Sequence, residues 1–168
     1  WARGRALPAG PLAQAASLPE ADCLFSVANL RVLPPALLRR ARQAFNFHDG
    51  PLPRYAGLHA PHWALICGET RHGVTWHEMT EAVDRGRIAR QQLFDLAPDE
   101  TAQSLNARCY EAGFTTFLAL MDDLAAGGAV LAPQRGPASG FGRHLRPPAL
   151  ATLDWSWRAP QLCALVRG

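Results

Sequence analysis

The sequence contains no lysine, so its positive charge comes from arginine alone, and the arginines are scattered rather than gathered in one stripe. Acidic residues nearly balance them, which leaves a formal net charge of +3 at pH 7. A surface that binds nucleic acid through its phosphates needs a clustered basic patch. The composition therefore gives no indication of a nucleic-acid-binding module.

Other features are also missing. No apolar run approaches the roughly 18 residues that a membrane span requires, and no signal peptide is visible. Neither glycine-rich phosphate loop, GxGxxG or GxxxxGK followed by Ser or Thr, occurs in the chain. Their absence counts against NAD and ATP as ligands.

The cysteines form no CxxC pair, and each lies in an apolar stretch. This pattern predicts reduced core residues in a cytosolic protein rather than a disulfide framework. The four residues are Cys23, Cys67, Cys109 and Cys163.

The 168 residues suffice for one domain, and 48% of them are hydrophobic, which is enough for a sizeable core. Short apolar runs alternate with helical patterns, and this order favours an α/β fold with a largely parallel sheet. Strands are expected at 23–30, 44–48, 73–79 and 88–96. Helices are expected at 34–43, at 60–68 and from an N-cap at Asp99 to Gly127.

The stretch 46–73 holds four of the six histidines. Asn46 and His48 lie at the end of a predicted strand and, being two residues apart, point to the same side. Ligands of open α/β sheets bind at strand ends. The next carboxylate in a comparable position is Asp84, between two more predicted strands.

An amide, an imidazole and a carboxylate suit attack on a carbonyl carbon. Asn46 can donate to the developing oxyanion, His48 can stabilise it or move a proton, and Asp84 can orient His48 or collect a proton. No nucleophilic serine or cysteine is needed if the substrate brings its own amine. The residues alone leave open a purely structural alternative, in which His48 is a hydrogen-bonded loop histidine and Asp84 is a turn residue.

A metal hydrolase is a rival interpretation, because the chain has a dense group of histidines. However, neither HExxH nor HxxEH occurs, and no second cluster closes a site. We therefore expect no metal. The histidines concerned are His59, His62, His72 and His77.

Several motifs occur in a fixed order. They are Asn46-x-His48, the loop Leu-Pro-Arg-Tyr-x-Gly at 52–57, Gly-Val-Thr at 73–75 and Asp84-x-Gly86. This series resembles the central stretch of the folate-dependent formyltransferases, a family that includes methionyl-tRNA formyltransferase and glycinamide ribonucleotide transformylase. The resemblance runs from about residue 23 to residue 127, and the LDW at 153–155 is similar to the family's exit from its catalytic domain.

The resemblance implies that 10-formyltetrahydrofolate is the formyl donor, with no metal. It also implies that Asn46 and His48 hold the formyl oxygen while Asp84 manages the amine proton. Thr75 and His77 match positions that line the same pocket. The residues matched to the folate-binding loops are Leu30, Arg31, Val32, Leu33, Thr80, Glu81, Ala82 and Val83.

The implied fold is a Rossmann-like α/β domain with a mostly parallel sheet that lacks the family's first strands. We expect an N-terminally incomplete catalytic domain at 1–132, followed at 133–168 by a linker and the start of a C-terminal region. A sheet without its first strands exposes an edge.

The acceptor is expected to be a primary amine. The sequence of the stretch 48–79 is most similar to formyltransferase domains of peptide-synthetase-type enzymes. This similarity implies that the acceptor is an amino-acid amine and that the partners are a carrier protein or downstream synthetase domains. The alternatives are a methionyl-tRNA formyltransferase, with nucleic acid as partner, and a truncated module without catalysis. A cytoplasmic protein without a membrane partner is expected in each case.

One residue departs from the family pattern. Asp49 follows His48 directly, where the family usually has a small residue or proline. It is either a solvated turn residue before Gly50 or a carboxylate that binds part of the amine substrate.

Overall fold

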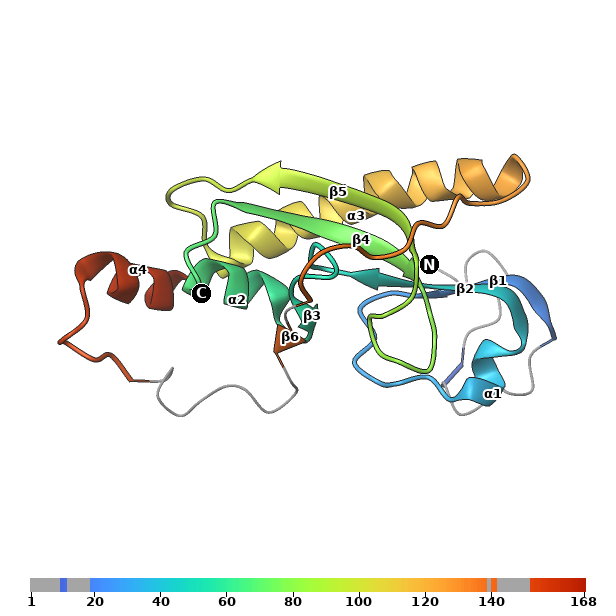
Figure 1. Ribbon diagram of the computed structural model, residues 1–168, viewed down its shortest axis with the longest axis horizontal. Coiled ribbons are helices and arrows are strands. Elements are labelled where there is room, and N and C mark those ends of the chain that lie inside the picture. The colour runs from blue at the N-terminus through green and yellow to red at the C-terminus, as the bar shows by residue number, and fades with distance from the viewer. Residues whose placement is uncertain (1–9, 12–18, 139, 142–151) are drawn as a thin grey trace.

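The computed structural model describes residues 10–11, 19–138, 140–141 and 152–168. Its centre is a four-stranded sheet in the order β1-β2-β4-β5 (Figure 1). A second, two-stranded parallel sheet pairs β3 with β6. The strands are β1 (Ala21–Ser26), β2 (Ala41–His48), β3 (Ala56–Gly57), β4 (Arg71–Glu78), β5 (Ile88–Asp95) and β6 (Gly140–Phe141).

The α/β class is confirmed, but the expectation of a mostly parallel sheet is wrong. Strands β1 and β2 are parallel, whereas β2–β4 and β4–β5 are antiparallel. The loop 79–87 joins two neighbouring strands directly, and a connection this short has no room for the crossover that parallel strands need. The main sheet is therefore mixed.

The helices are α1 (Pro35–Leu38), α2 (Ala60–Ile66), α3 (Ala102–Ala125) and α4 (Ala159–Arg167). The helix expected at 34–43 is much shorter, because the chain from Ala41 onwards pairs with β1. Helix α3 is capped by Thr101 rather than Asp99. The Thr101 side chain accepts from the Ser104 amide at 3.1 Å, and Ser104 Oγ accepts from the Thr101 amide at 2.9 Å.

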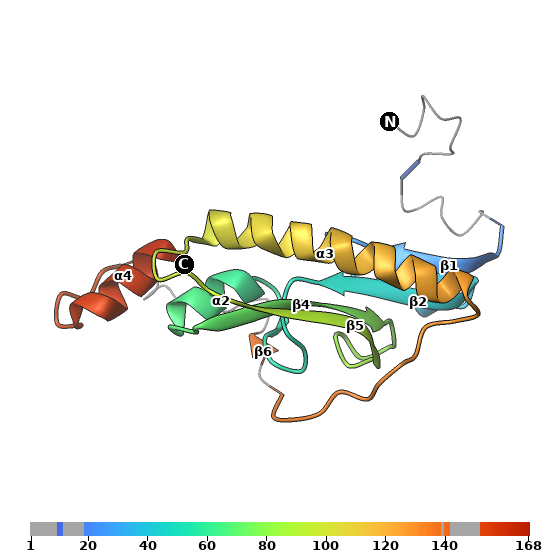
Figure 2. The same ribbon diagram turned by 90° about the horizontal axis from the view of Figure 1, so that it is seen from above.

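Helix α3 covers one face of the sheet (Figure 2). Phe45 and Phe47 of β2 and Val74 and Trp76 of β4 pack against it and are almost fully buried. Gly113 permits this approach, since a Cβ atom there would lie 2.4 Å from the Phe47 ring. The hydrophobic core thus lies between α3 and the alternate residues of β2 and β4.

The intervening residues of the same strands face the other way. In the β2–β4 register Asn46 is opposite His77, and His48 is opposite Thr75. Four polar side chains therefore gather on the face away from α3. The loop 79–87 folds over this face, on the side opposite the helix (Figure 2).

Strand β1 was expected to be buried on both faces, but it pairs only with β2 within the described residues and is half-buried. Phe25 packs against Phe45 and Phe117. Helix α3 also carries exposed apolar side chains at helical spacing, namely Tyr110, Phe114, Leu118 and Met121. No helix in the described part of the chain is both long and apolar enough to cross a bilayer.

The segment expected to be a linker contacts the rest of the fold where it is described. Strand β6 pairs with β3, and α4 packs beside α2. Gln134 donates to the main-chain oxygens of Asp84 and Gly86, at 2.9 and 2.8 Å. The boundary at residue 132 stays a prediction, but residues on its far side support the loop that carries Asp84.

The cysteines are free thiols. Only Cys109 is a core residue, and burial raises the pKa of its thiol to about 12. Cys23 is half-buried, while Cys67 and Cys163 are exposed. The expectation that all four lie in the core is wrong.

Candidate functional site

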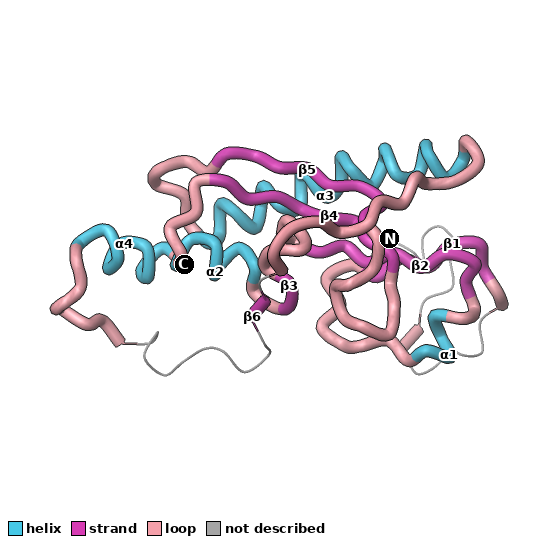
Figure 3. Tube along the Cα trace, in the orientation of Figure 1, coloured by secondary structure: helices cyan, strands magenta, loops and turns pink. Residues whose placement is uncertain are grey.

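A cavity of about 640 Å³ opens where β1 and β2 end. Figure 3 shows the loops gathered at that side of the sheet. Asn46, His48, His77 and Asp84 all line it. Most of the residues matched to the folate loops also line it: Leu30, Arg31, Val32, Leu33, Thr80, Ala82 and Val83. Glu81 is exposed and does not line it.

His48 is 5% exposed, and a hydrogen bond to the main chain fixes its ring. Its Nε2–H donates to the main-chain oxygen of Tyr55 at 2.8 Å, since a carbonyl can only accept. Gly50 leaves room for the ring, because a Cβ atom there would lie 2.7 Å from Nε2. The nitrogen left for chemistry is Nδ1, which lies 3.7 Å from Oδ2 of Asp84.

Asp84 reaches the site from a tight turn. Its own φ is +55°, in the left-handed region, and its Oδ2 accepts the Gly57 amide at 2.8 Å. Gly86 allows the turn to close, since a Cβ atom there would lie 1.8 Å from the Glu78 main-chain oxygen. The Asp-x-Gly motif thus has a steric reason: the turn packs directly on the end of β4.

The electrostatics of Asp84 favour its ionised form. Burial acts to raise its pKa, but the contact with His77, the nearby His48 ring and the hydrogen bond from the Gly57 amide together outweigh burial and hold the pKa below its ordinary value. The carboxylate is therefore ionised at neutral pH, although it is only 8% exposed.

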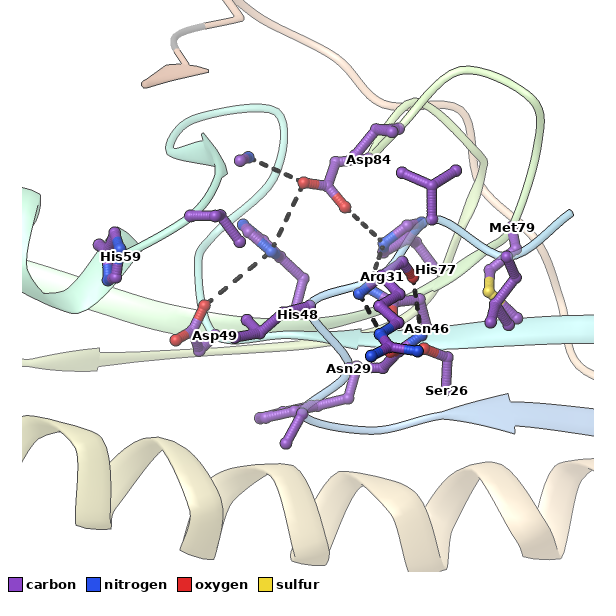
Figure 4. A pocket seen from close by; sticks show the side chains of 18 of the residues that line it. Ser26, Asn29, Arg31, Asn46, His48, Asp49, His59, His77, Met79 and Asp84 are labelled. Atoms are coloured by element: carbon purple, nitrogen blue, oxygen red, sulfur yellow. Dashed lines mark hydrogen bonds and ion pairs between the residues drawn. The ribbon is translucent and has the colours of Figure 1, made fainter. Parts of the chain in front are cut away.

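His77 lies between Asn46 and Asp84 (Figure 4). Its Nδ1–H donates to the Glu78 main-chain oxygen at 2.9 Å. Its Nε2 lies 3.2 Å from Nδ2 of Asn46 and 3.3 Å from Oδ1 of Asp84. The sequence indicated only a lining role for His77, whereas the structure makes it the link between two of the three expected catalytic residues.

Thr75, which was expected to line the pocket, lies behind it and is fully buried. Its hydroxyl donates to the Gly50 oxygen at 2.8 Å and accepts from the Leu52 amide at 3.2 Å. Gln91 donates to Thr75 Oγ1 at 3.0 Å. Thr75 therefore fixes the loop that follows His48 and does not face the cavity.

The four histidines of the metal interpretation, at positions 59, 62, 72 and 77, do not form a metal site. His72 is buried, and its Nε2–H donates to the Asp49 oxygen at 2.8 Å. Burial lowers the pKa of His72, so it is a neutral structural residue. His59 and His62 pack edge to face at the start of α2. Within the described residues, no group of three His, Cys, Asp or Glu side chains is placed to hold a metal ion.

Several residues of the site were not singled out from the sequence, and three of them are informative. Gln134 holds the Asp84 turn, and Asn106 and Tyr110 of α3 line the cavity. The spacing of Asn106 and Tyr110, one helical turn apart, places them on one face of α3, but nothing in the sequence shows that this face meets the end of β2. Gln134 lies in a segment whose composition predicts only a linker.

Comparison with known proteins places this geometry in context. A family model described as formyl transferase matches residues 7–120. A curated methionyl-tRNA formyltransferase from Chlorobium chlorochromatii is 39% identical over 109 residues, which are 64% of this chain. The chain spans 35% of the length of that relative.

Solved structures share the fold at lower sequence identity. An N-formyltransferase from Helicobacter canadensis, in complex with folinic acid and dTDP-3-aminofucose, is 20% identical with a TM-score of 0.84, over 99% of this chain and 61% of its own. A 4-N formyltransferase from Francisella tularensis is 19% identical with a TM-score of 0.78, over 87% of this chain and 60% of its own.

Proposed function

Because the chain belongs to the formyl transferase family, we propose that it transfers a formyl group from 10-formyltetrahydrofolate to a primary amine. The observation that carries the proposal is the convergence of Asn46, His48 and Asp84 on one cavity. Asn46 and His48 come from strand β2 and Asp84 from a turn, and hydrogen bonds fix each of them before any substrate binds.

The roles follow from the hydrogen-bonding capacity of each group. Asn46 Nδ2 carries two hydrogens: one points to His77 Nε2, and the other is available to the formyl oxygen as it gains negative charge. His48 presents Nδ1 on the same side, near Asp84. The ionised Asp84 accepts the proton that the amine loses.

His77 acts as a positioning residue in this proposal. Its contact with Asn46 fixes which way the amide points, and its Nε2 can take up or return a proton at Oδ1 of Asp84. The Nδ1–H bond to Glu78 prevents the ring from flipping. His77 can therefore accept the proton that Asp84 takes from the amine.

The cavity fits a flat, largely aromatic donor. The side chains of Leu30, Val32 and Val83 are 70%, 61% and 58% exposed, and all three line the cavity. Apolar surface left open beside polar groups is typical of a ligand site. Folate supplies the formyl group when it is bound, and these side chains would hold its ring system. Folinic acid, a formylated folate, is bound in the Helicobacter canadensis relative.

The acceptor class is a primary amine. The comparisons name methionyl-tRNA and sugar formyltransferases, and they lend no support to the amino-acid acceptor of a peptide synthetase that the sequence suggested. The intact hydrogen-bond network of the site favours catalysis over the alternative of a module that only binds.

The test is a formyl-transfer assay on the full chain with 10-formyltetrahydrofolate. Three amines cover the acceptor classes: methionyl-tRNA, dTDP-3-aminofucose and free methionine. Formylation of one amine, lost on His48→Ala and Asp84→Ala, supports the proposal. Absence of folinic acid binding in a calorimetric titration contradicts it without reference to the acceptor.

A further inference from the structure

The Nδ1 atom of His48 lies between two carboxylates (Figure 4). Asp84 Oδ2 is 3.7 Å away on one side, and Asp49 Oδ1 is 4.0 Å away on the other. The two differ in environment, since the side chain of Asp84 is 8% exposed and that of Asp49 is 37% exposed. One carboxylate is enclosed, and the other meets the solvent-filled cavity.

The Asp49 side chain makes no hydrogen bond to the described residues that would stabilise the bend in which it lies. Within the described part of the chain its carboxylate accepts no hydrogen bond, and its only ion pair is the long contact with His48. Its main chain is fixed, because its carbonyl oxygen accepts from buried His72. A rigid backbone thus presents a carboxylate with both oxygens available to a ligand.

The position of Asp49 separates it from the expected folate side. In Figure 4, Arg31 and Met79 lie on one side of His48, and Asp49 and His59 lie on the other. Asn106 and Tyr110 of α3 line the same cavity. A donor held against the loops at 30–33 and 79–83 leaves the Asp49 side open for the acceptor.

We propose that Asp49 binds the acceptor amine in its ammonium form and delivers it to Asp84. This inference rests on the proposed function. An aliphatic primary amine has a pKa near 10, so it arrives protonated at neutral pH and must lose a proton before it can attack. The proton passes from the ammonium nitrogen to the Asp84 carboxylate, which leaves a neutral amine and a neutral carboxylic acid. Asp49 is thus a specificity residue that selects a cationic acceptor.

The test separates charge from shape. The full chain is titrated with propylammonium chloride and with 1-propanol, its neutral analogue, with and without folinic acid, while NMR follows the imidazole resonances of His48. We expect Asp49→Asn to weaken propylammonium binding about tenfold, as for loss of a hydrogen bond to a charged group. Binding of 1-propanol should not change, and Asp49→Glu should retain affinity for the cation.

The matched control is Asp122→Asn, which removes an exposed carboxylate of α3 outside the cavity lining. Equal propylammonium affinity in the wild type and Asp49→Asn, or no binding to either, overturns the inference. The folinic acid titration decides the proposed function separately, because the amine titration without folate reports on Asp49 alone. Once an acceptor is found, Asp49→Asn should raise its KM far more than it lowers kcat.

Discussion

Nε2 of His77 lies 3.3 Å from Oδ1 of Asp84, and the same nitrogen lies 3.2 Å from the amide of Asn46. A single imidazole therefore joins the proposed oxyanion donor, Asn46, to the proposed proton acceptor, Asp84. We expect His77→Phe to lower kcat by roughly 10²–10³-fold, as for loss of an acid–base group. His77→Gln should lose less, because its amide can still contact Asn46. Steady-state kinetics measure both, and unchanged turnover in His77→Phe would remove His77 from the mechanism.

Asn46, His48 and Asp84 should act as one unit. Each alanine variant is expected to lower formyl transfer by roughly 10²–10⁴-fold, the range for oxyanion donors and general bases. The double variant His48→Ala, Asp84→Ala should be far less damaging than the product of the single losses. Additive losses would mean that the two residues serve separate steps.

The stability of the fold should depend on the ionisation of Asp84. Its folded pKa is lowered, so its contribution is complete above the unfolded value of about 3.9 and is lost as the pH falls through the folded value. We expect Asp84→Asn to cost about 1–3 kcal/mol at pH 7, because the Gly57 amide loses a charged acceptor. Urea unfolding at several pH values measures the difference, which should shrink steadily on acidification below pH 4. A constant difference would argue against the lowered pKa.

Gln134 should matter for activity although it touches no substrate. Gln134→Leu removes both hydrogen bonds to the Asp84 turn, and we expect kcat to fall about tenfold, since a displaced catalytic group is costly. Arg135→Ala, an exposed neighbour, is the control and should be neutral. If Gln134→Leu matched this control, the turn would hold its shape without residue 134.

Gly86 should tolerate no side chain. The Cβ atom of Gly86→Ala would meet the Glu78 oxygen, and relieving the clash requires the turn to move. We expect a loss of stability of about 1–3 kcal/mol together with a loss of activity. Arg85→Ala changes the same turn at an exposed position and serves as the comparison. Thermal unfolding and turnover, measured on both variants, distinguish a steric effect from a general sensitivity of the loop.

Much of the site could be predicted because it lies on short, strongly patterned segments. Two residues of spacing were enough to place Asn46 and His48 on one side of β2, and the structure agrees. Asp84 depended on the motif series, since spacing alone cannot show that a turn folds back over a sheet. Its hydrogen bond from the Gly57 amide comes from a loop far away in the sequence.

Two features could not be predicted from the sequence, the boundary between α1 and β2 and the role of Gln134, and each has a physical reason. The boundary between α1 and β2 was misplaced because pairing with β1 overrode a local helical pattern at 41–43. The role of Gln134 depends on a contact across 50 residues, and no local pattern carries that information. The antiparallel β4–β5 pair is different, because the short connection at 79–87 is evidence against the largely parallel sheet that we expected.

Because side chains alternate along β2 and β4, the same strands determine both the hydrophobic core and the candidate site. Phe45 and Phe47 belong to the core only while Asn46 and His48 belong to the site, because odd and even positions face opposite sides. Inserting or deleting one residue within β2 would exchange these two pairs of side chains. The amide and the imidazole would then lie in the hydrophobic core, and the phenyl rings would lie in the cavity. A change of two residues would instead preserve the parity and only shift the set along the strand. Length variation among homologues should therefore spare both strands and accumulate in their connecting loops.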